Sequence, residues 1–193
     1  MKMTIRGGWI LLLVLAGGCV QKKEPVEKFF DFKELLDEQT DLLSQHGRSL
    51  DKTSYVMNQN SDTTFVPSNY VWKTELELFQ QLEEFNKPIY KSEYRIEDAI
   101  KDTRSNLKIR QYISERAPIR SMKFYYHEDF AHLKKIEATI HQNNLLYTNG
   151  LVLVMEFEDE DGKPLLSRYT MNGFQKMMLR DSVHYSLEGQ VDQ

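Results

Sequence analysis

Cysteine is nearly missing from this chain: Cys19 is the only one among 193 residues. A single thiol cannot form a disulfide within the chain, so the fold has to be stable without a cross-link, even in an oxidising compartment. Long apolar runs are missing too. The longest, Trp9–Ala16, has eight residues, whereas a membrane-spanning helix needs about 20. No segment is therefore expected to cross a bilayer as a helix.

The chain also lacks an excess of basic charge and lacks catalytic signatures. Its 25 Lys and Arg residues are outnumbered by 29 Asp and Glu residues, and without a basic stripe nucleic acid is not an expected partner. Neither a Gly-x-Ser-x-Gly elbow nor a glycine-rich phosphate loop occurs. His127 and His132 are five positions apart, not the four that place two zinc ligands on one helical face. We expect no enzyme, no bound metal and no cofactor.

The first residues do contain the three parts of a secretory signal peptide. Lys2 and Arg6 give a positive start, the apolar run follows, and small residues precede Cys19. Leu15–Cys19 (LAGGC) resembles the lipobox of bacterial lipoproteins, although in that motif the leucine usually lies one position nearer the cysteine. The resemblance implies cleavage between Gly18 and Cys19. The alternative is an ordinary signal peptide in which the cysteine is incidental.

The lipobox resemblance further implies that Cys19 is the lipid attachment site. In such lipoproteins the sulfur carries a diacylglycerol and the amino group carries a fatty acid such as palmitate. One acyl chain gives marginal membrane binding, whereas two or more give stable attachment. We expect residues 1–18 to be the signal peptide, residues 19–26 the lipidated cysteine and its tether, and residues 27–193 one globular domain. The expected location is the cell envelope, at the outer membrane, in either leaflet.

Helical spacing of apolar residues predicts two amphipathic helices near the start of the domain. The first covers residues 26–46 and ends at Gly47. The second begins after Pro67-Ser68-Asn69, with Trp72 on its apolar side and Glu75 on the opposite side.

From residue 89 onward the apolar period changes from helical to alternating, which is typical of an antiparallel sheet with one solvated face. Leu151–Phe157 is apolar on both faces and is expected at the centre, and Asp161-Gly162 predicts a tight hairpin. A short strand is expected at Lys52–Gln59, followed by a turn at 60–63. The other alternating apolar sets are Tyr90/Tyr94/Ile96, Leu107/Ile109/Ile113, Met122/Phe124/Tyr126, Ile136/Ala138/Ile140 and Val183/Tyr185/Leu187.

Helices followed by a run of strands indicate the α+β class. We expect two N-terminal amphipathic helices packed on a curved, mainly antiparallel sheet of about six to eight strands.

Several short motifs resemble those of a group of small uncharacterised lipoproteins found in Bacteroidota. They are an opening Phe30-Asp31-Phe32-Lys33, a helix with Trp72–Leu76 that ends before Asn86-Lys87-Pro88, and the element Asn144–Tyr147. The resemblance covers nearly the whole mature chain. It implies an envelope location and no particular reaction.

Three functions are compatible with these features, the third of which is an enzyme whose site is assembled from scattered residues. The first is a lipid-anchored, non-catalytic accessory protein that interacts with another envelope protein and with the membrane through Cys19. The alternative is a carrier of a lipid or other apolar ligand in a groove between sheet and helices. The aromatic side chains expected to line such a groove are Tyr90, Tyr94, Phe124, Tyr126, Phe157 and Tyr185.

Overall fold

The fold is taken from a computed structural model in which residues 29–57 and 59–192 are described. The predicted signal peptide, Cys19 and tether lie outside these ranges. Helix α1 (Phe32–His46) precedes a hairpin of β1 (Leu50–Val56) and β2 (Gln59–Phe65). Helix α2 (Asn69–Leu76) continues into the 3₁₀ helix η1 (Glu77–Asn86), and α3 (Pro88–Lys91) follows. The later strands are β3 (Arg95–Lys101), β4 (Lys108–Ile113), β5 (Ile119–Tyr126), β6 (Leu133–Asn143), β7 (Tyr147–Glu160), β8 (Lys163–Met177) and β9 (Ser182–Val191).

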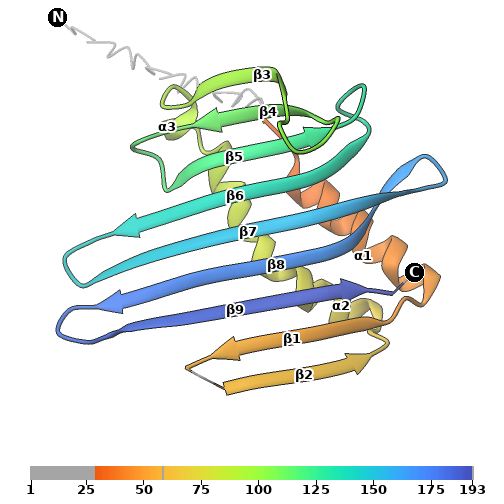
Figure 1. The fold of residues 1–193 in the computed structure, drawn as a ribbon, viewed down its shortest axis with the longest axis horizontal. Helices are drawn as coiled ribbons and strands as arrows, with labels where there is room; N and C mark the ends of the chain where they lie inside the picture. Colours follow the sequence, from red (N-terminus) through yellow and green to blue (C-terminus); the bar gives the residue numbers. More distant parts are fainter. Residues whose placement is uncertain (1–28, 58, 193) are drawn as a thin grey trace, which may run out of the picture.

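The nine described strands form one open antiparallel sheet in the order β2-β1-β9-β8-β7-β6-β5-β4-β3. Strands β3 to β9 run up and down in sequence, and the early β1–β2 hairpin adds to β9 by pairing Leu50 with Val191 (Figure 1). Strand β7 therefore occupies the centre, as its apolar sequence predicts. Asp161 and Gly162 connect β7 to β8 with φ angles of 54° and 78°, which confirms the predicted tight turn.

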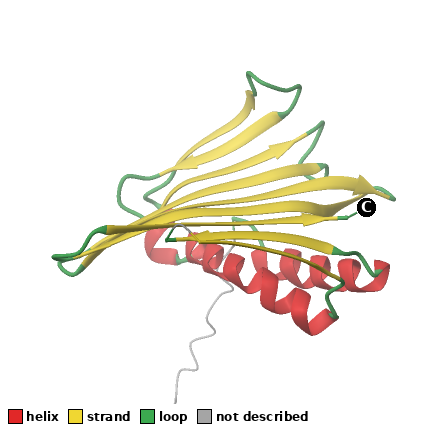
Figure 2. Cartoon of the chain, turned by 60° about the horizontal axis from the view of Figure 1, so that its bottom comes forward, coloured by secondary structure: helices red, strands yellow, loops and turns green. Residues whose placement is uncertain are grey.

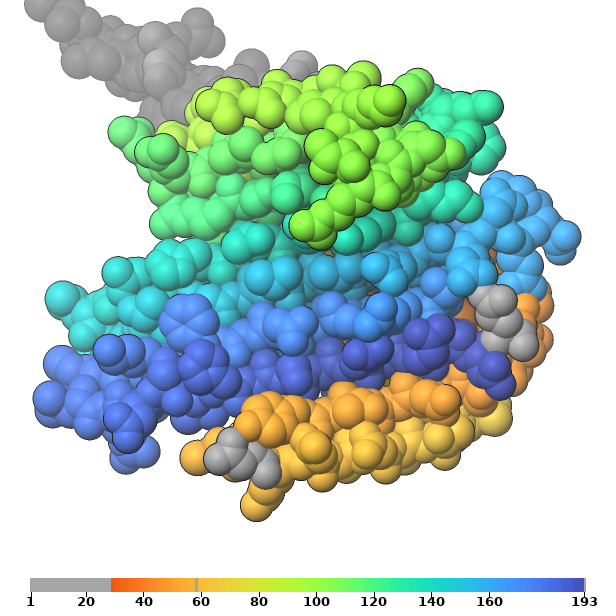
Figure 3. Space-filling model, in the orientation of Figure 1, coloured from red at the N-terminus to blue at the C-terminus, as the bar shows by residue number. Residues whose placement is uncertain are grey.

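All the described helices lie against one face of the sheet (Figure 2). The opposite face has no helix over it, and Figure 3 shows its strands as an open surface. At one end, the strands from β6 to β9 project past the helices (Figures 1 and 2). None of the helices in the described ranges combines the length and apolar composition needed to span a membrane.

The covered face is filled by large side chains. Phe32, Trp72, Phe79 and Phe85 from the helices are fully buried against strand residues such as Phe124. Phe85 lies 4.9 Å, centroid to centroid, from the ring of Tyr112 on β4. Edge and tilted contacts of this kind stabilise a core beyond the area that they bury.

Local signals explain where α1 begins and ends. The Asp31 carboxylate accepts a hydrogen bond of 3.1 Å from the backbone N–H of Glu34, and Gly47 ends the helix with a φ of 59°. The buried side chain of Asn86 accepts from the N–H of Phe29 at 3.0 Å and donates to the carbonyl of Phe30 at 2.8 Å. This amide fixes the start of the described chain to the end of η1.

The broad prediction of an open, mainly antiparallel sheet with few helices is confirmed, but its finer form differs. The sheet has nine strands because residues 60–63, expected as a turn, lie inside β2. Tyr90 lies in α3, since Pro88 starts a new helical turn there. In β4 it is Tyr112 that faces the helices, so the predicted row of Ile109 and Ile113 lies on the uncovered face.

Candidate functional site

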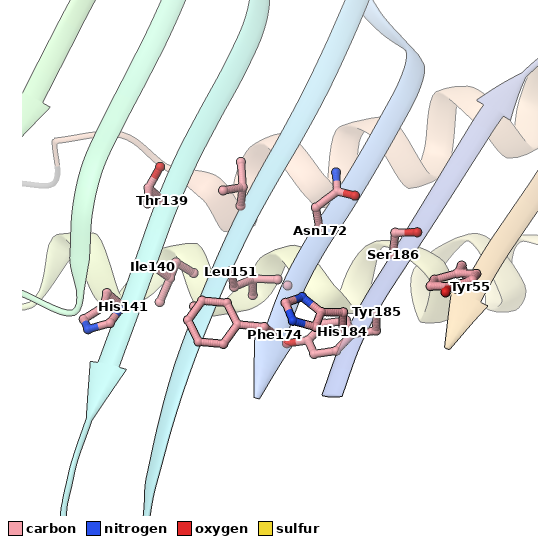
Figure 4. A pocket seen from close by; sticks show the side chains of 13 residues that line it. Tyr55, Thr139, Ile140, His141, Leu151, Asn172, Phe174, His184, Tyr185 and Ser186 are labelled. Carbon is pink, nitrogen blue, oxygen red and sulfur yellow. The ribbon is translucent and has the colours of Figure 1, made fainter. Parts of the chain in front are cut away.

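A shallow hollow of about 490 Å³ lies on the uncovered face, where β6 to β9 and β1 run side by side (Figure 4). Two rows of paired residues line it. In one row, Thr139 pairs with Val152, Val152 with Asn172, Asn172 with Ser186, and Ser186 with Tyr55. These side chains share one face because their strands are in register and every second residue of a strand points the same way.

The second row places two imidazoles and one phenyl ring across the same strands. His141 pairs with Gly150, Gly150 with Phe174, and Phe174 with His184. The rings of Phe174 and His184 lie 5.9 Å apart at an angle of 35°, and Figure 4 shows them next to each other with His141 and Tyr55 to either side. The row forms an aromatic strip across the sheet.

Gly150 allows the phenyl ring of Phe174 to lie on the strand surface. A Cβ atom at this position would overlap the ring. The next strand pair has the same arrangement on the helix-covered face, where the ring of Tyr185 covers Gly173. Glycine inside a strand often marks a close approach of this kind.

The lining of the hollow contains no Asp, Glu, Lys or Arg side chain. Its polar groups are the hydroxyls of Thr139, Ser186 and Tyr55, the amide of Asn172, and the imidazoles of His141 and His184. Charged groups begin outside it, where they pair with one another: Arg168 Nε donates to Glu188 at 2.9 Å, and Lys123 donates to Glu137 at 3.1 Å. The hollow can therefore offer aromatic contact and hydrogen bonds, but no strong charge, to a ligand.

The six aromatic residues predicted to line an apolar groove are placed differently. Tyr94, Phe124, Tyr126 and Phe157 are buried core residues, and Tyr90 packs partly buried against the core. Burial raises the pKa of the Tyr94 phenol, whose O–H donates to the carbonyl of Ile119 at 3.0 Å. A groove between sheet and helices stays a prediction, and this ring packing does not favour it. Tyr185, the sixth residue, is among the residues that line the hollow, although its ring lies over Gly173 on the helix-covered face.

His127 and His132 lie in the loop between β5 and β6. The Nδ1 atom of His132 is 2.8 Å from a carboxylate oxygen of Asp129. Within the described residues, no cluster of three or more His, Cys, Asp or Glu side chains is arranged to hold a metal ion.

The hollow is not predicted by the sequence patterns described above, although two features of the sequence are compatible with it. Gly150 and Gly173 interrupt otherwise well-formed strands, and Phe174 directly follows the second glycine. What the sequence did not reveal is the register that places Phe174 opposite Gly150.

No protein-family model, curated protein or solved structure showed a significant match to this chain.

Proposed function

We propose that this chain is an outer-membrane lipoprotein that binds a neutral, hydroxyl-rich ligand, such as a glycan, on the uncovered face of its sheet. The hollow carries the proposal: aromatic rings at Phe174, His184 and Tyr55 alternate there with hydroxyl and amide groups, and no carboxylate or ammonium group lines it. The flat faces of sugar rings pack on aromatic side chains, while their hydroxyls need short-range hydrogen-bond partners.

Anchorage at Cys19 is the second part of the proposal, and the lipobox sequence supports it. The lipid would keep the domain at the envelope, in line with the resemblance to lipoproteins of Bacteroidota. Cys19→Ser should abolish labelling of the chain by a fatty-acid probe and leave the signal peptide attached. Continued acyl labelling of that variant would exclude Cys19 as the site.

A binding role fits the hollow better than a catalytic role. The residues that line it include no Asp, Glu or Lys, the side chains that most often join histidine in general acid–base chemistry. His141 and His184 stand at opposite ends of their row, separated by Gly150 and Phe174. The alternative role, an apolar carrier, needs space between sheet and helices, where the described core is densely packed with rings.

Calorimetric titration of the mature lipoprotein in detergent tests the proposal. The titrants are neutral oligosaccharides, such as maltoheptaose and cellohexaose, and neutral polysaccharides of outer-membrane origin. Phe174→Ala removes the central ring and Asn172→Ala removes the amide, so each should weaken binding at least about tenfold, which corresponds to about 1.4 kcal/mol.

Thr170→Ala is the matched control, since Thr170 lies on the same face of β8 but outside the hollow. It should leave the affinity unchanged. Binding that survives both Phe174→Ala and Asn172→Ala, or a chain that binds only acidic saccharides, would contradict the proposal.

A further inference from the structure

Exposed apolar side chains gather on three neighbouring hairpin turns. Seven of the twelve large apolar residues that are exposed in the described chain lie there: Val56, Met57, Leu145, Leu146, Met177, Met178 and Leu179. The side chains of Leu145 and Leu179 are 93% and 98% exposed. Scattered exposed apolar residues are normal, but a group of this kind marks an interaction surface.

The order of the strands brings the three turns to one end of the sheet. The turns β1–β2, β8–β9 and β6–β7 follow one another along that end, where the sheet projects past the helices (Figure 1). Strands lie about 4.8 Å apart, so successive turns are about 10 Å apart. Two of them also contact directly, because the backbone N–H of Met178 donates to the carbonyl of Leu146 at 2.9 Å. We name Met57, Leu145, Leu146, Met178 and Leu179 the apolar tips.

Two of the apolar tips stand in a backbone conformation that disfavours them. Met57 and Leu179 have φ angles of 51° and 62°, the left-handed region that Gly, Asn and Asp occupy most readily. A leucine or methionine there loses conformational preference and, on this surface, also exposes apolar area to water. The cost of exposure is removed if these side chains contact something apolar, and such a contact would offset the cost of the backbone conformation.

The β6–β7 turn exposes its two leucines, Leu145 and Leu146, to solvent. The side-chain oxygen of Asn144 accepts from the backbone N–H groups of Leu146, at 2.8 Å, and Tyr147, at 3.0 Å. These bonds close the turn on itself and leave Leu145 and Leu146 projecting. The turn is a formed structure in the free protein, so contact with a partner does not require it to fold.

We propose that the apolar tips insert into the interfacial region of a lipid bilayer and hold the sheet end-on against the membrane. Separate projecting turns that also carry exposed polar residues, such as Asn144 and Asp181, suit a surface where headgroups and water solvate the polar atoms. Lys176 and Arg180 flank the β8–β9 turn against a single acid, Asp181. The excess of positive charge at this turn would attract the anionic headgroups of a membrane.

The position at which the chain enters the domain agrees with this orientation. The ring of Phe29 packs against Tyr94, just before β3, and against Tyr112, near the end of β4, at centroid distances of 6.1 and 5.2 Å. These strand termini belong to the same end of the sheet as the apolar tips. Cys19 is ten residues before Phe29. An extended chain of ten residues reaches at most about 33–36 Å, so the lipid would lie within that distance of Phe29.

This inference rests on the proposed lipid anchor only for delivery to the membrane, and the test separates the two. The mature lipidated protein is reconstituted into vesicles of phosphatidylethanolamine and phosphatidylglycerol. An environment-sensitive fluorophore is placed on Leu145→Cys or Leu179→Cys. Val66→Cys is the matched control, because Val66 is also an exposed apolar residue but follows β2 at the opposite end of the sheet.

Probes at residues 145 and 179 should shift to the blue and be quenched by nitroxide-labelled lipid, whereas the probe at residue 66 should behave as it does in water. Equal, water-like emission from all three probes would overturn the inference. So would a shift that appears in detergent with rising protein concentration, since that result assigns the tips to a second copy. Labelling of the parent protein itself would reveal a free Cys19 thiol and count against the anchor alone.

Discussion

At the scale of single residues, Trp72 is the test of how α2 packs. It is predicted from the helical pattern to face the sheet, and in the structure it is fully buried. Truncating a buried Trp usually costs about 3–5 kcal/mol, so Trp72→Ala should strongly lower the free energy of unfolding in a denaturant melt. Lys73→Ala, at the exposed neighbouring position, should change it by less than about 0.5 kcal/mol. Equal midpoints for both variants would mean that the helix is not docked as described.

The helical pattern predicts a solvent-facing position for Glu75 and misses its contacts with the sheet. The pattern places it on the solvent side, opposite Trp72, yet its carboxylate accepts from Tyr169 at 3.0 Å and from Lys52 at 2.6 Å. Both partners come from strands that are far away in the sequence. A helical period predicts which residues are apolar neighbours, but it says nothing about a buried phenol on the sheet that needs an acceptor.

Asp98 gives a pH dependence whose sign can be worked out. The Arg110 guanidinium donates to it at 2.6 Å and lowers the pKa of its carboxyl from 3.8 to about 2. Because this pKa is lower in the folded chain than in the unfolded one, the contribution of Asp98 to stability is complete above pH 3.8 and is lost as the pH falls towards 2. The parent protein should thus lose more thermal stability over this interval than Asp98→Asn does. Parallel melting curves across it would contradict the assignment.

At the scale of elements, aromatic rings that lie over glycines hold the centre of the sheet together. Gly150, Gly173 and Gly189 each face the ring of the residue paired with it on the next strand: Phe174, Tyr185 and Tyr169. Such pairs pin the register, because a slip by one residue would move every ring to the other face.

Gly189 should be the least replaceable of these glycines. The Tyr169 ring above it is fully buried, packs edge-on against Phe79 with centroids 5.9 Å apart, and hydrogen-bonds to Glu75. A methyl group in Gly189→Ala would overlap a ring that cannot move, and overpacking of this kind costs about 1–3 kcal/mol. Gly150→Ala is the comparison, since the half-buried Phe174 ring can swing away. Chemical denaturation should find Gly189→Ala the less stable variant, and the reverse order would refute the packing account.

Alternation predicted most strands but not always their orientation. Met122 and Phe124, like Ile136 and Ala138, face the core as expected. In β4 the predicted orientation was wrong. Tyr112, although it carries a polar atom, faces the core, so Ile109 and Ile113 lie on the uncovered face. The polar strand β2 was missed because an exposed edge strand needs no apolar face and therefore leaves no alternating pattern.

At the scale of the whole molecule, the early hairpin and the last strand are joined by pairing that no local pattern encodes. Strand β1 lies between β2 and β9, so the start and the end of the domain are fixed to each other. The same pairing brings Tyr55 to Ser186 and completes one row of the hollow. The hollow could not be predicted from the sequence because its residues come from five strands, and only the global register brings them together.

The three-dimensional arrangement separates two surfaces with different chemistry. The aromatic strip of the hollow lies on the uncovered face, whereas the apolar tips lie at the end of the same strands. A domain held at the membrane by its tips would keep that face open to the surroundings. The proposed lipid on Cys19, the proposed contact of the apolar tips with the bilayer and the proposed binding at the hollow are compatible with one orientation. In it, the uncovered face of the sheet would lie open close to the bilayer.

The proposed binding at the hollow can be tested by hydrogen–deuterium exchange of the protein with and without a neutral oligosaccharide at saturating concentration. We expect slower exchange at the backbone amides of residues 150–152, 172–174 and 184–186, which line the hollow. Exchange in α1, α2 and η1 should stay the same, because these helices cover the other face. If protection is confined to the helices, or if exchange at the hollow is unchanged while the protein binds the saccharide, the hollow is not the binding site.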